Sequence, residues 1–309
     1  MFVSIGGIEQ WVQVGDGTGA GAADRPVLLY LHGGPGGTSV PLSAAWKPWD
    51  EYFTVVHWDQ RGASRTFRRN GPEGCGSLTL DLMVRDGLEV VEYVLGTLAP
   101  ASGRVVLVGH SWGSALGVHM LKRRPELFSA YVGTGQLVNM RGNEEYNYRW
   151  TLRRAQLMGN TEAVDAVRAL GAPPLSDPVK LKTLREWSDR FAEGDGDPLT
   201  PSPPVRPANF GPDDVPPMMA GAEFSLRQLL PELFKVDLPA LGLEFEVPMF
   251  FFHGACDHHT PAELAERYCA SISAPHKEFV RFEGCHHFVV MNRPADFLRE
   301  LVARVLPRV

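Results

Sequence analysis

Residues with catalytic potential follow strand-like segments at several points of this 309-residue chain. A run of branched apolar residues at 105–108 leads into Gly109-His110-Ser111-Trp112-Gly113, and a small-residue helical pattern follows it. Such a strand–turn–helix holds a serine hydroxyl at the apex of a strained turn, where the two glycines let strand and helix approach closely. The pattern predicts that Ser111 is a nucleophile rather than an ordinary turn serine.

A serine nucleophile needs an imidazole to take its proton and a carboxylate to hold that imidazole in the right tautomer. Asp257 follows the apolar run at 248–254, and His286 and His287 follow the strand-like segment at 278–282. In a parallel sheet these positions converge on one edge, and the order Ser, Asp, His is typical of this architecture. The alternative for Asp257 is a structural position at the start of the next helix. The residues alone leave the choice between the two histidines open.

The negative charge of an acyl-transfer intermediate requires backbone N–H donors that are fixed in advance. Trp112, directly after Ser111, supplies one predicted donor, and Gly34 in the glycine-rich run 32–37 supplies the other. Glycines there let a substrate carbonyl approach the backbone. A phosphate-binding loop is the alternative, but the lysine and hydroxyl of a P-loop are missing from this run. The sequence therefore predicts an oxyanion hole.

Five potential metal ligands lie beside the predicted triad: Asp257, His258, His259, His286 and His287. They lack the helical i, i+4 spacing of a His-x-x-x-His site, and the triad already accounts for two of them. His258 and His259 are interpreted as polar loop residues. We therefore expect no metal and no cofactor.

Alternating strand and helix patterns must position these residues. Strand-like runs lie at 27–31, 53–58, 104–109, 128–132, 248–254 and 278–282, and helical patterns lie at 79–98, 112–124, 261–272 and after Pro294. This alternation predicts a mostly parallel sheet with helices on both faces. A hairpin with its turn at Gly6-Gly7 precedes them, followed by a glycine- and alanine-rich loop over 15–25. Asp59 and Arg61 are expected to brace their loop through an ion pair.

The alternation stops at about residue 136 and resumes at about 247. Helices are expected to begin at Asn143, to span 161–170, to run from an N-cap at Asp177 to Gly194, and to span 223–235. A proline-rich loop over 195–217 lies between the last two. We predict a core domain over 1–135 and 247–309, and a helical cap over 136–246.

The composition limits the possible partners and locations. A net charge of −6 argues against nucleic acid and anionic membranes as partners. No apolar run is long enough to span a membrane, and residues 1–7 lack the features of a signal peptide. The oligomeric state is not indicated by the sequence. The four cysteines are Cys75, Cys256, Cys269 and Cys285. They are too few and scattered for a disulfide framework, so we expect free thiols in the cytoplasm, with Cys256 and Cys285 as inert small hydrophobes beside the triad loops.

Together these motifs resemble those of α/β-hydrolases, in particular the proline iminopeptidase-like serine aminopeptidases. The resembling segments are His32-Gly33-Gly34-Pro35-Gly36, Asp59-Gln60-Arg61-Gly62, Gly109-His110-Ser111-Trp112-Gly113, Gly254-Ala255-Cys256-Asp257 with Pro261, and His287 before the last helix. The resemblance implies the α/β-hydrolase fold with an inserted cap, and cleavage of an amide or ester through an acyl-enzyme. It favours His287 over His286, because the family's histidine lies seven residues before the proline of the last helix, here Pro294.

In peptidase members of this family, acidic side chains in or near the cap hold the amine of a small apolar N-terminal residue. The acidic candidates here are Glu144, Glu145 and Glu223, which are also interpreted as helix-start or solvated charges. The resemblance predicts an aminopeptidase that releases N-terminal proline or a small apolar residue from short peptides. His258 stands where some members carry an acid, and the cap matches poorly. A carboxylesterase or other small-molecule hydrolase is therefore the alternative. A non-enzymatic binding protein is a third reading, against which the intact triad argues.

Overall fold

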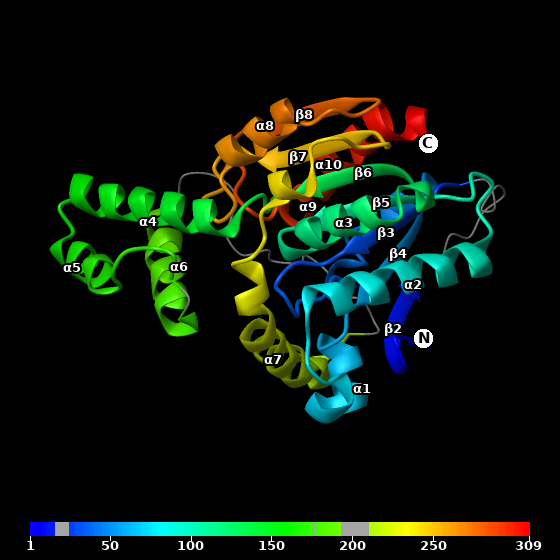
Figure 1. Cartoon of the computed structure of the whole chain (residues 1–309), viewed down its shortest axis with the longest axis horizontal. Helices are drawn as coiled ribbons and strands as arrows, with labels where there is room; N and C mark the ends of the chain where they lie inside the picture. Colours follow the sequence, from blue (N-terminus) through cyan, green and yellow to red (C-terminus); the bar gives the residue numbers. More distant parts are fainter. Residues whose placement is uncertain (16–24, 176, 193–209) are drawn as a thin grey trace.

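One eight-stranded sheet forms the centre of the computed structural model, which describes residues 1–15, 25–175, 177–192 and 210–309 (Figure 1). The strand order is β1-β2-β4-β3-β5-β6-β7-β8. The pairs β1–β2 and β2–β4 are antiparallel, and the six strands β3 to β8 run parallel to one another. This confirms the predicted mostly parallel sheet. The strands are β1 (Phe2–Ile5), β2 (Ile8–Val14), β3 (Val27–Leu31), β4 (Thr54–Asp59), β5 (Val105–His110), β6 (Phe128–Thr134), β7 (Met249–Gly254) and β8 (Lys277–Phe282).

Helices cover both faces of the sheet because side chains of a strand point alternately to opposite sides. Leu29 and Leu107 share one apolar core with residues of α2 and α3, whereas Leu28 and Val106 share another with Trp46 and with residues of α10. The helices are α1 (Ser64–Cys75), α2 (Leu80–Leu98), α3 (Trp112–Arg123), α4 (Met140–Leu157), α5 (Thr161–Ala169), α6 (Pro178–Ala192), α7 (Val215–Leu233), α8 (Ala262–Ser271), α9 (Val289–Asn292) and α10 (Pro294–Glu300).

Several helix boundaries differ from the sequence predictions. Helix α4 begins three residues before Asn143, because Asn139 caps it by accepting a hydrogen bond from the Gly142 N–H at 2.8 Å. Helix α7 begins at Val215 rather than at 223, and α1 was not predicted. Part of the predicted loop over 195–217 and most of that over 15–25 lie outside the described residues.

The described residues between β6 and β7 form helices α4 to α7 and contribute no strand to the sheet. We call these four helices the cap. In Figure 1, α4, α5 and α6 extend to one side of the sheet, and α7 lies next to α1. The two ends of the cap are joined: Asn139 and Asp237 form an antiparallel bridge, and the Leu238 N–H donates to the Val138 carbonyl at 2.9 Å. The predicted cap boundaries at 136 and 246 stay a prediction.

The predicted ion pair between Asp59 and Arg61 is wrong. Arg61 Nε donates instead to Asp86 Oδ2 on α2 at 2.7 Å, and both side chains are buried. Asp59 accepts a hydrogen bond from Thr38 Oγ1 at 2.5 Å, and burial raises its pKa to about 6. Arg61 therefore fixes the loop after β4 to α2, while Asp59 faces the loop after β3.

Across the described ranges, no helix is both long and apolar enough to cross a membrane. The cytoplasmic location stays a prediction.

Candidate active site

Ser111 lies in the tight turn between β5 and α3, as the sequence predicts. Its backbone has φ 54° and ψ −120°, a positive φ that L-residues rarely adopt. The flanking glycines allow this turn. A methyl group on Gly113 would lie 2.2 Å from the Leu31 carbonyl oxygen, and one on Gly109 would lie 2.5 Å from that of Gly113. The turn is therefore held by backbone contacts that only glycine permits.

His287 is the histidine that pairs with Asp257. Its Nδ1–H donates to Asp257 Oδ2 at 2.8 Å, whereas His286 Nδ1–H donates to the Cys256 carbonyl at 2.9 Å. Burial alone would raise the pKa of Asp257, but its electrostatic interactions and hydrogen bonds with His287 and His253 hold that pKa well below its usual range. Asp257 is thus an ionised acceptor that fixes the tautomer of His287.

Thr260 and His253 support this pair. The Thr260 hydroxyl donates to Asp257 Oδ2 at 2.7 Å, and its backbone N–H donates to Oδ1 at 2.9 Å. His253 Nδ1 accepts from the Gln136 N–H, so its Nε2–H donates to the Thr260 carbonyl at 2.7 Å and lies 3.4 Å from Asp257 Oδ2. Every side of the carboxylate therefore faces a donor.

The residue before Ser111 holds the loop that carries His287. His110 Nε2–H donates to the His287 carbonyl at 3.0 Å, and the two ring centroids are 4.8 Å apart. Burial is the main cause that lowers the pKa of His110 to about 3, so the ring is neutral. Gly135 lies against the ring of His287, since a methyl group on Gly135 would be 2.8 Å from His287 Cε1.

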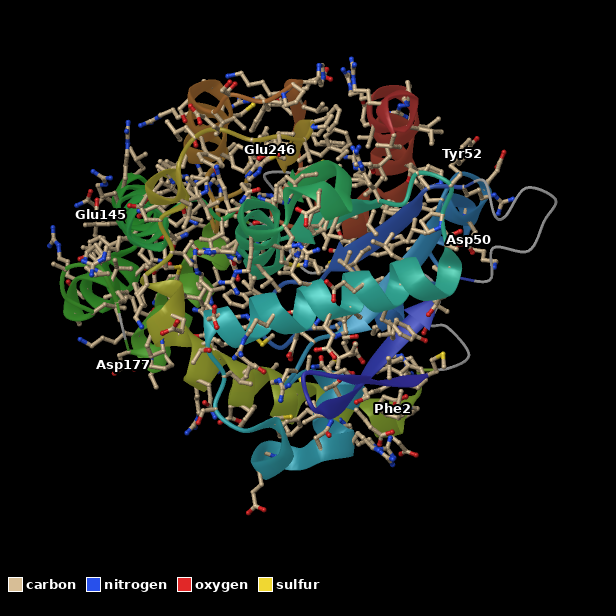
Figure 2. The ribbon with its side chains drawn as sticks, turned by 45° about the vertical axis from the view of Figure 1, so that its right-hand side comes forward. Phe2, Asp50, Tyr52, Glu145, Asp177 and Glu246 are labelled. Atoms are coloured by element: carbon tan, nitrogen blue, oxygen red, sulfur yellow. The ribbon has the colours of Figure 1, made fainter. Side chains whose placement is uncertain are left out.

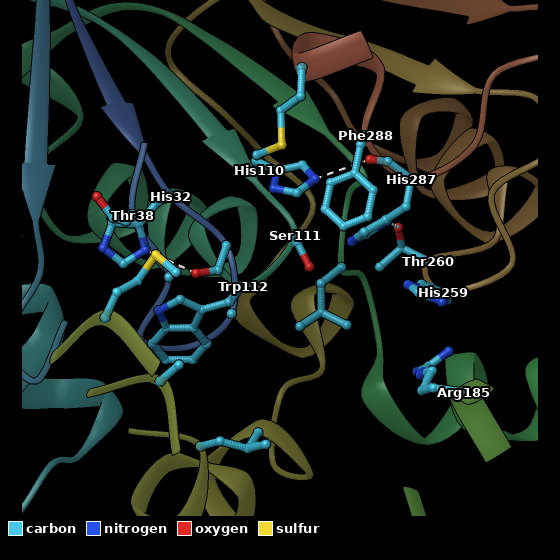
Figure 3. A pocket seen from close by; sticks show the side chains of 18 of the residues that line it. His32, Thr38, His110, Ser111, Trp112, Arg185, His259, Thr260, His287 and Phe288 are labelled. Atoms are coloured by element: carbon cyan, nitrogen blue, oxygen red, sulfur yellow. Dashed lines mark hydrogen bonds between the residues drawn. The ribbon is translucent and has the colours of Figure 1, made fainter. Parts of the chain in front are cut away.

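Ser111, His287, His110 and Thr260 line a cavity of about 690 Å³ (Figure 3). The Ser111 hydroxyl points into it, with His287 on one side and Trp112 on the other. Much of the remaining wall is apolar and comes from the cap and the last helices, including the four methionines Met140, Met218, Met219 and Met291. Methionine side chains adapt to irregular apolar ligands.

The two predicted oxyanion donors lie at the same cavity. Trp112 is the first residue of α3, where backbone N–H groups have no partner within the helix, and Gly34 lies in the loop after β3. Gln60 connects the two segments: its Oε1 accepts from Trp112 Nε1 at 2.9 Å, and its Nε2 donates to the His32 carbonyl at 3.1 Å. His32 also accepts from the Gln60 N–H at Nε2, and burial lowers its pKa to about 4.

The three acidic candidates occupy different environments. Glu144 on α4 is fully buried and forms an ion pair with Arg185 on α6, which lines the cavity. The side chains of Glu145 and Glu223 are 53% and 66% exposed and face arginines of their own helices. Figure 2 shows Glu145 at the outer surface of the molecule. Only Glu144 therefore approaches the cavity wall.

Sequence reasoning missed several residues at this site. Thr260 had a local signal, because a hydroxyl three residues after an aspartate at a helix start is well placed to bond its carboxylate. Arg185 had none, since no motif surrounds it. His259 was interpreted as a loop residue, but it lines the cavity and donates to Asp189 Oδ1 of the cap at 2.8 Å.

Within the described parts of the chain, no group of three or more His, Cys, Asp or Glu side chains is arranged to hold a metal ion. The Cys256 N–H donates to the Cys285 carbonyl at 2.9 Å. This bond joins the loops that carry Asp257 and His287.

Comparisons with known proteins identify the family of this chain. The model of the alpha/beta hydrolase family matches residues 28–300. The chain is 29% identical over 283 residues to the probable aminopeptidase YbaC of Bacillus subtilis (strain 168), covering 90% of this chain and 88% of that protein. It is 32% identical over 119 residues to the proline iminopeptidase of Neisseria gonorrhoeae, 38% of this chain and 34% of that one.

A solved structure shows the same fold. The proline iminopeptidase of Mycobacterium smegmatis superposes with a TM-score of 0.65 at 21% identity, over 99% of this chain and 97% of that one. The family match spans the parallel strands from residue 28 onward, the Ser111 turn and the Asp257–His287 pair. The chain therefore belongs to the α/β-hydrolase family and is similar to proline iminopeptidases.

Proposed function

We propose that this protein is a serine hydrolase that cleaves an amide or ester through an acyl-enzyme. The observation that carries the proposal is the 2.8 Å hydrogen bond from His287 to Asp257, at the wall of the cavity into which the Ser111 hydroxyl points.

In the proposed reaction, Ser111 Oγ bonds to the substrate carbonyl carbon while His287 Nε2 takes the hydroxyl proton. The N–H groups of Trp112 and Gly34 bind the oxyanion. The C–N or C–O bond then breaks, and His287 gives its proton to the leaving group. A water molecule repeats the sequence on the acyl-enzyme, which releases the acid and restores Ser111.

The proposed substrates are short peptides from which an N-terminal proline or small apolar residue is released. Similarity to a probable aminopeptidase along 90% of the chain supports this choice. The cavity supports it too, because about 690 Å³ of mostly apolar space beneath a cap suits a small substrate rather than a long chain.

A carboxylesterase is the second candidate. One observation favours it: no aspartate or glutamate is found among the described residues that line the cavity. A substrate ammonium group would therefore meet no carboxylate on that wall, whereas an ester needs none.

Arylamide and ester hydrolysis by the purified protein tests these proposals. We expect turnover of proline and alanine p-nitroanilides, much slower turnover of N-acetyl-alanine p-nitroanilide, and loss of about a thousandfold or more in kcat for Ser111→Ala. The matched control is Ser102→Ala, on an exposed loop. Cleavage of p-nitrophenyl butyrate without any arylamide turnover would establish the second candidate. No hydrolysis, together with no fluorophosphonate labelling of Ser111, would reject both.

A further inference from the structure

One charged side chain stands out on the cavity wall. Of the described residues that line the cavity, Arg185 on α6 is the sole lysine, arginine, aspartate or glutamate. Its side chain is 21% exposed, and its Nη1 is a buried atom that has no hydrogen-bond partner in the described part of the chain. A guanidinium group carries five N–H donors in a fixed planar arrangement that matches a carboxylate.

Glu144 holds this guanidinium from behind. Its carboxylate is fully buried and accepts a hydrogen bond from Arg185 Nη2. Burial raises the pKa of Glu144, and the charge of Arg185 opposes that rise. Anchored in this way, the arginine keeps one orientation, and its exposed part faces the cavity. Glu144 itself does not line the cavity: Arg185 holds its Oε1, and its Oε2 is buried without a hydrogen-bond partner in the described part of the chain.

Arg185 lies on the leaving-group side of the site. In Figure 3, Arg185, His259, Thr260 and His287 lie on one side of Ser111, and Trp112 and His32 lie on the other. The rings of His259 and His287 are 5.1 Å apart. Because His287 would protonate the leaving amine, the leaving part of a peptide extends towards this side, and the acyl part extends towards Trp112.

We infer that Arg185 binds the C-terminal carboxylate of a short peptide, so that the preferred substrates are free dipeptides or tripeptides. The inference rests on the proposed peptidase function. A cationic side chain with unused donors, in a cavity wall that offers no acid among the described residues, favours an anionic group at that position. The C-terminal carboxylate is the anionic group that every short peptide carries.

The test compares free peptides with their C-terminal amides. We measure kcat/KM of the wild-type protein on Ala-Ala and Ala-Ala-Ala, on the two matching amides, and on alanine p-nitroanilide. We expect the free acid to be preferred about ten- to a hundredfold at one or both lengths, because a charge-assisted hydrogen bond is lost in the amide.

Variants then assign the preference to Arg185. In the double variant Glu144→Gln with Arg185→Gln, no buried charge is left without a partner, and the acid-to-amide ratio is expected to fall to about one. Arg185→Lys keeps a charge and is expected to retain part of the preference. Lys182→Gln is the matched control: it removes a positive charge from the same helix at a side chain that is 78% exposed, and we expect an unchanged ratio.

The outcomes separate the two proposals. Equal rates on acids and amides by a protein that cleaves alanine p-nitroanilide would overturn the inference and leave the peptidase intact. An unchanged ratio in the folded double variant would also overturn it. Failure to cleave any peptide or arylamide would instead reject the proposed peptidase itself.

Discussion

Asp189 of the cap accepts a hydrogen bond at 2.8 Å from His259 Nε2, and the His259 backbone N–H donates to Asp257 Oδ1 at 2.9 Å. One residue thus connects the cap to the carboxylate that pairs with His287. A second contact also connects the cap to the loop after β7: Trp150 of α4 stacks on His258, with ring centroids 3.7 Å apart. The position of the cap and the geometry of the candidate triad are therefore coupled through the loop after β7.

Asp189→Ala should loosen this connection. We expect KM for alanine p-nitroanilide to rise about three- to tenfold and α6 to exchange amide hydrogens faster. The loss of stability should be below about 1 kcal/mol, because the Asp189 side chain is 41% exposed. Asp165→Ala, at an exposed position of α5, is the control. Unchanged KM together with unchanged exchange in α6 would show that the contact does not hold the cap.

Asp257→Asn should lower kcat by roughly ten thousandfold with little change in KM. The asparagine amide cannot stabilise a charged imidazole, and it allows His287 the wrong tautomer. Asp81→Asn, at a side chain that is 61% exposed, is the control and should behave as wild type. Steady-state kinetics and a circular dichroism spectrum check both. If Asp257→Asn kept a tenth of the activity, another carboxylate would have to be assigned.

Gly113→Ala should destabilise the fold by about 2–4 kcal/mol, because its methyl group would meet the backbone carbonyl oxygens of Leu31 and His32 at 2.2 and 2.7 Å. Gly96→Ala is the matched change in an exposed part of α2 where a methyl group meets nothing within 4 Å. It should instead raise stability by about 0.5–1 kcal/mol. Urea unfolding distinguishes the two, and equal effects would contradict the packing around Ser111.

Acid should destabilise the protein through its buried neutral histidines. Burial lowers the pKa of His32 and His57 to about 4, and it is the main cause that lowers that of His110 to about 3, from an ordinary value of 6.5. Between these values the unfolded chain binds protons that the folded chain does not, so the free energy of unfolding falls as the pH falls below 6.5. At pH 5 each histidine should contribute about 2 kcal/mol to that loss.

His57→Gln tests this pH dependence of the free energy of unfolding at a histidine that does not line the cavity. His57 bonds to the Ser39 hydroxyl at 2.9 Å, and a glutamine amide can replace that bond. We expect the loss of stability between pH 7.5 and pH 5, measured by urea unfolding, to be about 2 kcal/mol smaller than in wild type. An identical pH dependence would mean that this histidine is protonated in the folded state.

The parallel strands could be predicted because their sequences are continuous apolar runs. All five residues of β3, Val27–Leu31, are buried, and the prediction matched them residue by residue. The candidate triad residues could also be located from local patterns, since Ser111, Asp257 and His287 each follow a strand of the sheet. The structure brings Asp257 and His287 into contact and leaves His286 on another partner.

The helices outside this pattern were harder to predict. Helix α1 is polar and contains Gly71-Pro72, with Gly71 at φ 66°, so its sequence is typical of a loop. The first turn of helix α7 contains Pro216 and Pro217, which are typical of a loop although proline is tolerated in a first helical turn.

Long-range polar partners left no signal in the sequence. Arg61 pairs with Asp86, Arg185 with Glu144 and His259 with Asp189, at separations of 25, 41 and 70 residues. Packing selects these partners, because several charges of the right sign are available along the chain. The positions of the candidate triad residues after their strands were therefore predictable, and the polar surroundings supplied by the cap were not.

The bridge between Asn139 and Asp237 gives the scaffold a modular character. A segment whose two ends adjoin each other can be exchanged as one unit, while Ser111, Asp257 and His287 keep their positions after their strands. Changes between those two positions can thus reshape the cavity wall while the sheet edge keeps its structure.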